Sequence, residues 1–349
     1  MTKTAVVILN WNGAAMLRRF LPGVVAHSQY GAREVIVADN ASTDNSLEVL
    51  REEFPQVRTI VLDRNWGFAD GYNKALEQVE ADYFVLLNSD VDVPEGWLEP
   101  LEEYMDAHTE VAAVQPKLLK YDISAADGNC RTRRFEYAGA AGGFVDRYGY
   151  PYCRGRLFDE VETDSGQYDT PLEVHWASGA CLMVRSCDYS AVGGLDGKFF
   201  AHCEEIDLCW RMRISGRKIM CVPGSQVYHV GGASLPKGNP YKTYLNFRNN
   251  LTMLYKDLPA RRLKGVMRVR FVLDLVAAAQ FLLTGKTGDA RAVLRARRDY
   301  GKWKKDFRMQ RDAIQGGRRL PEEDDTARIS LLWQFHIRRK QKWNTLPYF

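Results

Sequence analysis

Two adjacent glutamates and a later histidine are the residues of this chain best suited to acid–base and metal chemistry. Glu204 and Glu205 stand at the start of a segment with helical character, and His229 follows beside a Gly-Gly turn. A carboxylate can act as a general base, and a histidine can bind a divalent cation. Alone, these three residues are a weak signal, because a lone histidine is more often a structural hydrogen-bonding group.

Polar residues directly follow apolar runs at three upstream places, which strengthens the signal. The segments are VVILNWN (6–12), VADNASTDNS (37–46) and LLNSDVDV (86–93). Their Asn10, Asp39 and Asp90 would lie at the carboxyl ends of parallel strands, where open α/β sheets bind ligands. One polar residue at a strand end could arise by chance, whereas three at one edge indicate a binding site.

Apolar β-branched runs alternate with helical patterns through the first hundred residues. The expected strands are 4–9, 34–38, 58–62 and 83–87, and the expected helices are 14–26, 46–54 and about 71–79. This alternation predicts an α/β protein with a doubly wound parallel sheet. Later elements are a strand at 174–185, a helix at 204–216, a strand at 219–222 and helices from 241 onward. Residues 121–170 have little periodicity and are expected to form an insert or a mobile loop over the site.

Charge is distributed unevenly along the 349 residues, although the net charge is only +4. Residues 261–349 contain 22 Lys and Arg against 9 Asp and Glu, and residues 1–260 contain 26 against 35. The acidic part could hold a divalent cation, and the basic part could meet an anionic surface. The seven cysteines form no CxxC pair, which indicates free thiols rather than a disulfide framework or a zinc site.

Seven segments in sequence resemble the inverting family 2 glycosyltransferases, and in particular bacterial rhamnosyltransferase-like enzymes of polysaccharide assembly. The segments are VVILNWNG (6–13), VADNASTDNS (37–46), NWGFADGYNKAL (65–76), LLNSDVDV (86–93), WASGACLMVR (176–185), GGLDGKFFAHCEEIDLCWR (193–211) and VYHVGGAS (227–234). Two departures keep the carboxylates: the family usually has Pro at Ser89 and often Glu-Asp at Glu204-Glu205. The Q-x-x-R-W motif of processive members is absent, which favours a single-addition enzyme.

The resemblance implies a GT-A fold, a Rossmann-like and mostly parallel sheet flanked by helices, with a C-terminal helical appendage. The expected catalytic domain spans 1–240, with a nucleotide-binding half at about 1–95 and an acceptor and catalytic half at about 96–240. Residues 241–349 are expected to form a basic helical region.

The resemblance also implies a metal-dependent inverting transfer from a dTDP- or UDP-sugar, with rhamnose or a similar sugar moved to a saccharide. The expected general base is Glu205, whose pKa its neighbour Glu204 would raise, and Glu204 is the second candidate. The expected ligands of a Mn²⁺ or Mg²⁺ ion are Asp90, Asp92 and His229. A solvated acid in a turn remains the alternative for Asp92.

Binding roles follow from the same motifs. The expected nucleotide-sugar residues are Asn10, Asp39, Asn40, Asn65, Asn88 and Asp90, and the expected acceptor residues are Trp176, Ser178 and Gly179. Asn10 and Asn65 are also typical turn residues. Core packing remains the alternative for Trp176.

The basic C-terminal region offers a membrane surface as a partner. The apolar run FVLDLVAAAQFLL (271–283) is too short to span a bilayer. Basic flanks and three aromatic residues, Trp343, Tyr348 and Phe349, suit an anionic lipid surface and a lipid-linked saccharide acceptor. The expected location is cytoplasmic, at the inner face of the plasma membrane. Packing of this region on the catalytic domain or on a second copy of the chain stays open.

Two other functions are weighed against sugar transfer. A nucleotidyltransferase would need a Gly-rich, basic triphosphate loop after the first strand, and NWNGAAM is not one. A non-catalytic nucleotide-sugar-binding subunit would not need Asp90, Glu205 and His229 together. The basic tail alone is weak evidence for nucleic acid, so no nucleic-acid partner is expected.

Overall fold

The computed structural model describes residues 3–125, 130–231 and 238–347. One large sheet runs through the molecule and is built from ten strands. These are β1 (Thr4–Asn10), β2 (Arg33–Asp39), β3 (Arg58–Val61), β4 (Tyr83–Asn88), β5 (Val91–Asp92), β6 (Val111–Tyr121), β7 (Arg131–Phe135), β12 (Leu172–Glu173), β13 (Cys181–Arg185) and β14 (Lys218–His229).

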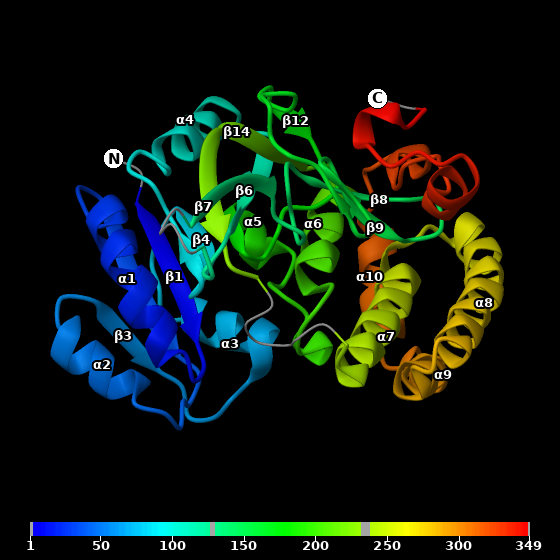
Figure 1. The fold of residues 1–349 in the computed structure, drawn as a ribbon, viewed down its shortest axis with the longest axis horizontal. Coiled ribbons are helices and arrows are strands. Elements are labelled where there is room, and N and C mark those ends of the chain that lie inside the picture. Colours follow the sequence, from blue (N-terminus) through cyan, green and yellow to red (C-terminus); the bar gives the residue numbers. More distant parts are fainter. Residues whose placement is uncertain (1–2, 126–129, 232–237, 348–349) are drawn as a thin grey trace.

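Helices surround this sheet and then continue as a separate group at one side of the molecule (Figure 1). Those of the first part are α1 (Ala14–Ser28), α2 (Ser46–Glu53), α3 (Gly67–Leu76), α4 (Glu99–Ala107), α5 (Ser186–Ala191) and α6 (Glu204–Ile214). Those of the C-terminal group are α7 (Pro240–Asp257), α8 (Ala260–Leu283), α9 (Thr287–Trp303) and α10 (Arg308–Gly316).

Strand order confirms the α/β prediction and adds an antiparallel element. The order is β12-β14-β6-β13-β4-β1-β2-β3, and β1 pairs in parallel with both β2 and β4. Strand β13 runs antiparallel between β4 and β6, so the sheet is mostly rather than wholly parallel. Of the strand expected at 174–185, only Cys181–Arg185 forms.

Alternating residues of β1 explain why helices cover both faces of the sheet. Val6 and Ile8 belong to the core cluster that contains Leu17 of α1. Ala5 and Val7 belong to the other cluster, which contains Tyr72 of α3. Because successive side chains of a strand point to opposite faces, an apolar run such as TAVVIL needs an apolar cover on each side.

The segment at 121–170, expected to be an insert or a mobile loop, contains short strands. Besides β7, it forms a separate antiparallel sheet of β8 (Gly143–Val145), β9 (Pro151–Cys153), β10 (Arg156–Leu157) and β11 (Glu160–Val161). These strands are two or three residues long, too short to give a periodic pattern in the sequence.

The C-terminal segment folds back onto the second sheet and onto α6. Leu331 and Trp343 belong to the same core cluster as the second sheet, and the backbone N–H of Leu331 donates to Asp146 Oδ2 at 2.8 Å. The indole of Trp210 on α6 donates to Asp325 Oδ1 at 3.2 Å. These contacts match the alternative in which the C-terminal region packs on the rest of the same chain.

Three further sequence predictions concern this tail and the thiols. Trp343 is buried, so it is not a lipid anchor, while Tyr348 and Phe349 lie outside the described residues. None of the helices in the described ranges carries an apolar stretch long enough to cross a bilayer. All seven cysteines are free, as predicted.

Candidate active site

Asp90 and His229 meet at the carboxyl end of β4, although they lie 139 residues apart. The short strand β5 pairs with the end of β14 and places His229 opposite Val91. His229 Nε2 lies 3.1 Å from Asp90 Oδ1 and 3.3 Å from Asn88 Nδ2. The structure thus brings three of the sequence-predicted residues together, and Asp90 and His229 are buried.

Glu136 is a fourth member of this site that the sequence did not indicate. Its Oε1 lies 3.5 Å from His229 Nδ1. Gly231 completes the site: its N–H donates to Asp90 Oδ2 at 3.3 Å, and its φ is +73°. A Cβ at Gly231 would lie 2.9 Å from Glu136 Oε1, and the positive φ favours glycine at this position. The end of that motif, residues 232–234, lies outside the described residues.

The electrostatics of this site favour a positive charge. Burial alone would lower the pKa of His229, but the carboxylates of Asp90 and Glu136 outweigh it and raise the pKa to about 10. Burial likewise works against the Asp90 carboxylate, yet His229 keeps the pKa of Asp90 below its ordinary value. Buried charge at this point is therefore stabilised by pairing.

A divalent cation fits Asp90 and His229 by the chemistry of their donor atoms. Carboxylate oxygen and imidazole nitrogen suit Mn²⁺, and carboxylate oxygen suits Mg²⁺. The described residues contain no group of three His, Cys, Asp or Glu side chains arranged to hold an ion. Ions of this kind are often bound by one or two carboxylates together with substrate phosphates. The protein would then supply only part of the coordination.

Asp92, the third expected metal ligand, is engaged elsewhere. Its carboxylate accepts from Arg131 Nε at 2.6 Å and from Arg131 Nη2 at 3.2 Å. The structure therefore does not bring Asp92 together with Asp90 and His229. Asp90 lies in the turn between β4 and β5, whereas Asp92 lies within β5 and is held there by Arg131.

Glu204 and Glu205 begin α6 with one carboxylate oxygen of each, Oε2, buried and without a hydrogen-bond partner. Burial raises the pKa of Glu205 to about 7, against backbone N–H groups that lower it. Burial also raises the pKa of Glu204, and there the Glu205 charge adds to the effect. The expected cause for Glu205, the charge of Glu204, is therefore wrong: burial raises the pKa of Glu205.

A strained loop sets the start of α6. Phe200, His202 and Cys203 all have positive φ values, of 66°, 71° and 69°. Asn249 of α7 holds this loop: its Nδ2 lies 3.0 Å from Phe199 O, and 2.8 Å from the carbonyls of both Ala201 and His202. Non-glycine residues keep such a conformation only where surrounding contacts enforce it.

The other charged residues of α6 are structural. The predicted pair forms, with Arg211 Nε 2.7 Å from Asp207 Oδ2. Lys256 of α7 lies 2.6 Å from Asp207 Oδ1 and 2.7 Å from Asp196 Oδ2. These buried ion pairs fix α6 against α7.

Asn10 and Asp39 form a hydrogen-bonded pair at the ends of β1 and β2. Asn10 Nδ2 donates to Asp39 Oδ1 at 3.0 Å and to Ser42 Oγ at 3.2 Å. The backbone N–H of Ser42 donates to Asp39 Oδ2 at 2.9 Å. Both Asn10 and Asp39 are fully buried, so a nucleotide base could reach them only through the surrounding loop.

Asn40 and Asn65 hold the loop that precedes α3. Asn40 Nδ2 donates to Gly67 O at 2.9 Å and to Asn65 Oδ1 at 3.1 Å, and Asn40 Oδ1 accepts from Trp66 N at 2.9 Å. Asn40 is therefore saturated by the fold. Asn65 Nδ2 makes no hydrogen bond with the described residues, so this side chain keeps a donor for a ligand.

The expected acceptor residues divide between core and site. Trp176 packs against Gly143 in the core, and its indole donates to Phe144 O at 3.0 Å. Core packing, the alternative to acceptor binding, is therefore what the structure shows for Trp176. Ser178 is also buried, and its hydroxyl donates to Ala138 O. Gly179 lies beside α6, because a Cβ there would be 3.6 Å from Glu205 Cβ.

The chain at Gly179 and Ala180 runs between Glu205 and the site formed by Asp90 and His229. Ala180 O accepts from the backbone N–H of Asn88, next to the Asp90 and His229 pair. The glutamate pair and the His229 site therefore belong to one region.

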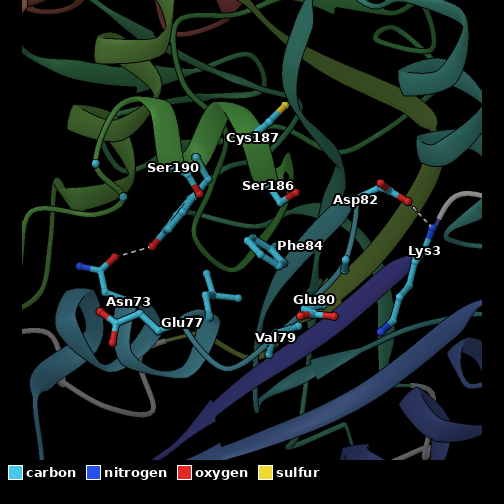
Figure 2. A pocket seen from close by; sticks show the side chains of 15 residues that line it. Lys3, Asn73, Glu77, Val79, Glu80, Asp82, Phe84, Ser186, Cys187 and Ser190 are labelled. Atoms are coloured by element: carbon cyan, nitrogen blue, oxygen red, sulfur yellow. Dashed lines mark hydrogen bonds between the residues drawn. The ribbon is translucent and has the colours of Figure 1, made fainter.

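A cavity of about 860 Å³ lies away from this region. Figure 2 shows Lys3, Asp82 and Phe84 along its wall, at the amino ends of β1 and β4. The candidate site is at the carboxyl ends of the same strands, so this cavity is not part of it.

Known proteins with similar sequences and folds include glycosyltransferases. Residues 5–155 match the family described as glycosyl transferase family 2. The chain is 23% identical over 235 residues to N-acetylglucosaminyl-diphospho-decaprenol L-rhamnosyltransferase of Mycobacterium tuberculosis, covering 64% of this chain and 75% of the relative. It is 38% identical over 171 residues to rhamnosyltransferase WbbL of Escherichia coli, covering 47% and 61%.

Among solved structures, GalNAc-T7 with UDP, GalNAc and Mn²⁺ superposes with a TM-score of 0.58 at 16% identity, over 92% of this chain and 59% of the other. This likeness establishes the fold, which is GT-A as expected. The family-model match and the two rhamnosyltransferase relatives support a family 2 glycosyltransferase of the rhamnosyltransferase-like type.

Proposed function

We propose that the chain is a metal-dependent inverting glycosyltransferase that moves rhamnose or a similar sugar from a dTDP- or UDP-sugar to a saccharide in cell-surface polysaccharide assembly. The observation that carries this proposal is the meeting of Asp90 and His229, 3.1 Å apart, in one region with Glu205, whose Oε2 is buried without a hydrogen-bond partner. A cation site beside a carboxylate of raised pKa is what inverting transfer requires.

The donor would lie along the carboxyl ends of β1, β2 and β4. Asp39 would face the pyrimidine base, with Asn10 orienting its carboxylate, and Asn65 would offer its unused Nδ2 group. A divalent cation at Asp90 and His229 would neutralise charge that develops on the leaving diphosphate. GalNAc-T7, which shares the fold, was solved with UDP and Mn²⁺, and this favours a nucleoside diphosphate donor and a cation.

Glu205 would act as the general base. Its carboxylate would accept the proton of the acceptor hydroxyl as the oxygen attacks the anomeric carbon. The new carbon–oxygen bond forms on the face opposite the breaking bond to the diphosphate, which inverts the anomeric configuration. A pKa of about 7 matches this role, because a general base works best when its pKa lies near the working pH. Glu204 remains the second candidate.

The acceptor would be a saccharide carried on a lipid. The Mycobacterium tuberculosis relative is named for a diphospho-decaprenol acceptor, and this name is the reason for the choice. Such an acceptor would bring the enzyme to a membrane. Gly179 would leave room for it, because it has no side chain between Glu205 and Phe68.

Thermal shift with nucleotides and metals tests the donor and cation sites together. We expect dTDP or UDP to raise the melting temperature only when Mn²⁺ or Mg²⁺ is present. Asp90→Asn should abolish this metal-dependent shift, whereas Asp92→Asn, which removes only the ion pair with Arg131, should retain it. A full shift in Asp90→Asn, or no shift with any nucleotide in the unmodified protein, would reject the proposed site.

A further inference from the structure

Helix α8 buries a charged pair in the middle of its inner face. Its buried residues are Val266, Arg270, Asp274 and Ala278, and Arg270 Nε lies 3.3 Å from Asp274 Oδ1. Arg297 of α9 also binds Asp274, and Arg270 Nη1 donates to Tyr148 O at 3.1 Å. An ordinary surface helix turns its charged residues to solvent and its apolar stripe inward.

The outward side of the second half of α8 is apolar. It exposes Phe271 (51%), Val272 (58%), Leu275 (41%), Val276 (59%), Leu282 (55%) and Leu283 (89%). Figure 1 shows α8 at the outer edge of the molecule, on the side away from the large sheet. A contiguous apolar patch on one helix face is a mark of an interaction surface.

The outward side of the first half of the same helix is basic. Lys264 and Arg268 are exposed there, and they continue toward Phe271 and Leu275 with spacings of three and four residues. Residues with these spacings lie on one face of a helix. One outward stripe therefore changes from cationic to apolar along the length of α8.

A cavity of about 700 Å³ opens beside the basic half, between α8 and the helices α7, α9 and α10. Its described lining contains the cations Lys264, Arg268, Arg297, Lys304 and Arg311 and no carboxylate. The side chains of Lys264, Arg268 and Lys304 form no hydrogen bond or ion pair with any described residue. The walls between these cations are apolar, with Leu263 and Met267.

We propose that α8 and this cavity dock the protein on a bilayer that contains anionic lipid. The apolar half of α8 would enter the boundary between headgroups and acyl chains, and the free cations would meet lipid phosphate. Helix α8 would lie on the membrane rather than cross it, since no described helix can span a bilayer. The inference deepens the proposed function by naming the surface at which a lipid-linked acceptor is met, but its evidence is independent of sugar transfer.

A second copy of the chain fits this surface less well than lipid does. If two α8 helices packed in parallel, Lys264 and Arg268 would face their own copies. If they packed antiparallel, these cations would lie on apolar residues without a counter-ion. Either arrangement leaves buried charge unpaired, which is costly.

Vesicle sedimentation with the full chain tests the proposal. The probes are phosphatidylcholine vesicles with and without about one-third phosphatidylglycerol. We expect the protein to bind the mixed vesicles at least about tenfold more tightly than phosphatidylcholine alone. Val276→Gln with Leu283→Gln should weaken that binding by about tenfold or more, because both exposed side chains would leave the bilayer. Lys264→Gln with Arg268→Gln should remove most of the preference for the anionic vesicles.

The matched control is Leu47→Gln with Val61→Gln, which removes two exposed apolar side chains from α2 and β3 at the opposite end of the molecule (Figure 1). This control should bind as the unmodified protein does. Equal binding by the α8 variant, or no vesicle binding by the unmodified protein, would overturn the proposal. A dimer in light scattering that the α8 variant converts to a monomer would also overturn it, in favour of a second copy. The α8 variant should keep the metal-dependent nucleotide shift, so loss of vesicle binding is distinguishable from failure of the proposed donor site.

Discussion

Replacing Glu205 by glutamine should reduce sugar transfer and, at the same time, stabilise the fold at alkaline pH. Burial raises the pKa of this carboxyl to about 7, from an ordinary value of 4.5. Each pH unit between those two values lowers the free energy of unfolding by about 1.36 kcal/mol. Charging Glu205 in the folded protein therefore costs about 3 kcal/mol in total.

The sign of this effect follows from proton binding. Below the ordinary pKa, Glu205 is protonated in both the folded and the unfolded chain, so it makes no pH-dependent contribution. As pH rises toward about 7, the unfolded chain loses the proton while the folded chain retains it, and stability falls. Above that pH the cost is constant. Glu205→Gln cannot ionise, so the variant escapes this loss.

Urea denaturation at about pH 5 and about pH 8 measures the stability effect. The unfolding free energy of Glu205→Gln relative to the unmodified protein should rise by 2 to 3 kcal/mol, on the order of the charging cost, between those conditions. Transfer activity should fall by about a hundredfold to ten-thousandfold, the usual contribution of a general base. Unchanged activity would reject the base assignment. Loss of activity without the pH-dependent stabilisation would show that Glu205 is not a buried, high-pKa carboxylate.

Two other changes separate positioning from packing. Asn249→Ala should lower kcat by about tenfold or more while leaving nucleotide binding intact, because it frees the loop before Glu204, and Asn246→Ala on the exposed side of α7 should not. If Asn249→Ala weakened nucleotide binding as much as it lowered kcat, the role of Asn249 would not be confined to positioning α6. Trp343→Ala should cost about 3 kcal/mol of unfolding free energy, since its ring packs between Phe144 and Tyr168, whereas exposed Trp333→Ala should cost less than about 0.5 kcal/mol. Similar costs would mean that the C-terminal segment is not part of the core.

The first half of the sheet was predictable because its signals are local. Apolar runs of four to six β-branched or aromatic residues, each followed by a polar strand end, mark β1, β2 and β4 within about two residues. The short strands of the second sheet give no such signal, since a strand of two residues is defined only by its partners. The antiparallel insertion of β13 is likewise a matter of long-range pairing that no local pattern contains.

The site was predictable where motif and strand end coincide, and not where a contact crosses the fold. Asp90, Asn88 and His229 come together as the motifs indicated. Glu136 could not be predicted, because it is one acid in a segment without periodicity. Its place beside His229 depends on the register of β6 and β7. Trp176 looked like a sugar-binding surface, but exposure is a property of the fold rather than of the residue type.

Buried polar contacts connect α8, the proposed docking helix, to α6, the helix that carries Glu205. Arg270 of α8 donates to Asn250 of α7, and the adjacent Asn249 holds the loop before Glu204. Lys256, further along α7, pairs with Asp207 within α6. Sliding α7 against either helix would leave charged or amide groups buried without partners, which costs far more than rearranging an apolar contact. The orientation that α8 adopts on a membrane would therefore fix the direction in which Glu205 meets an acceptor.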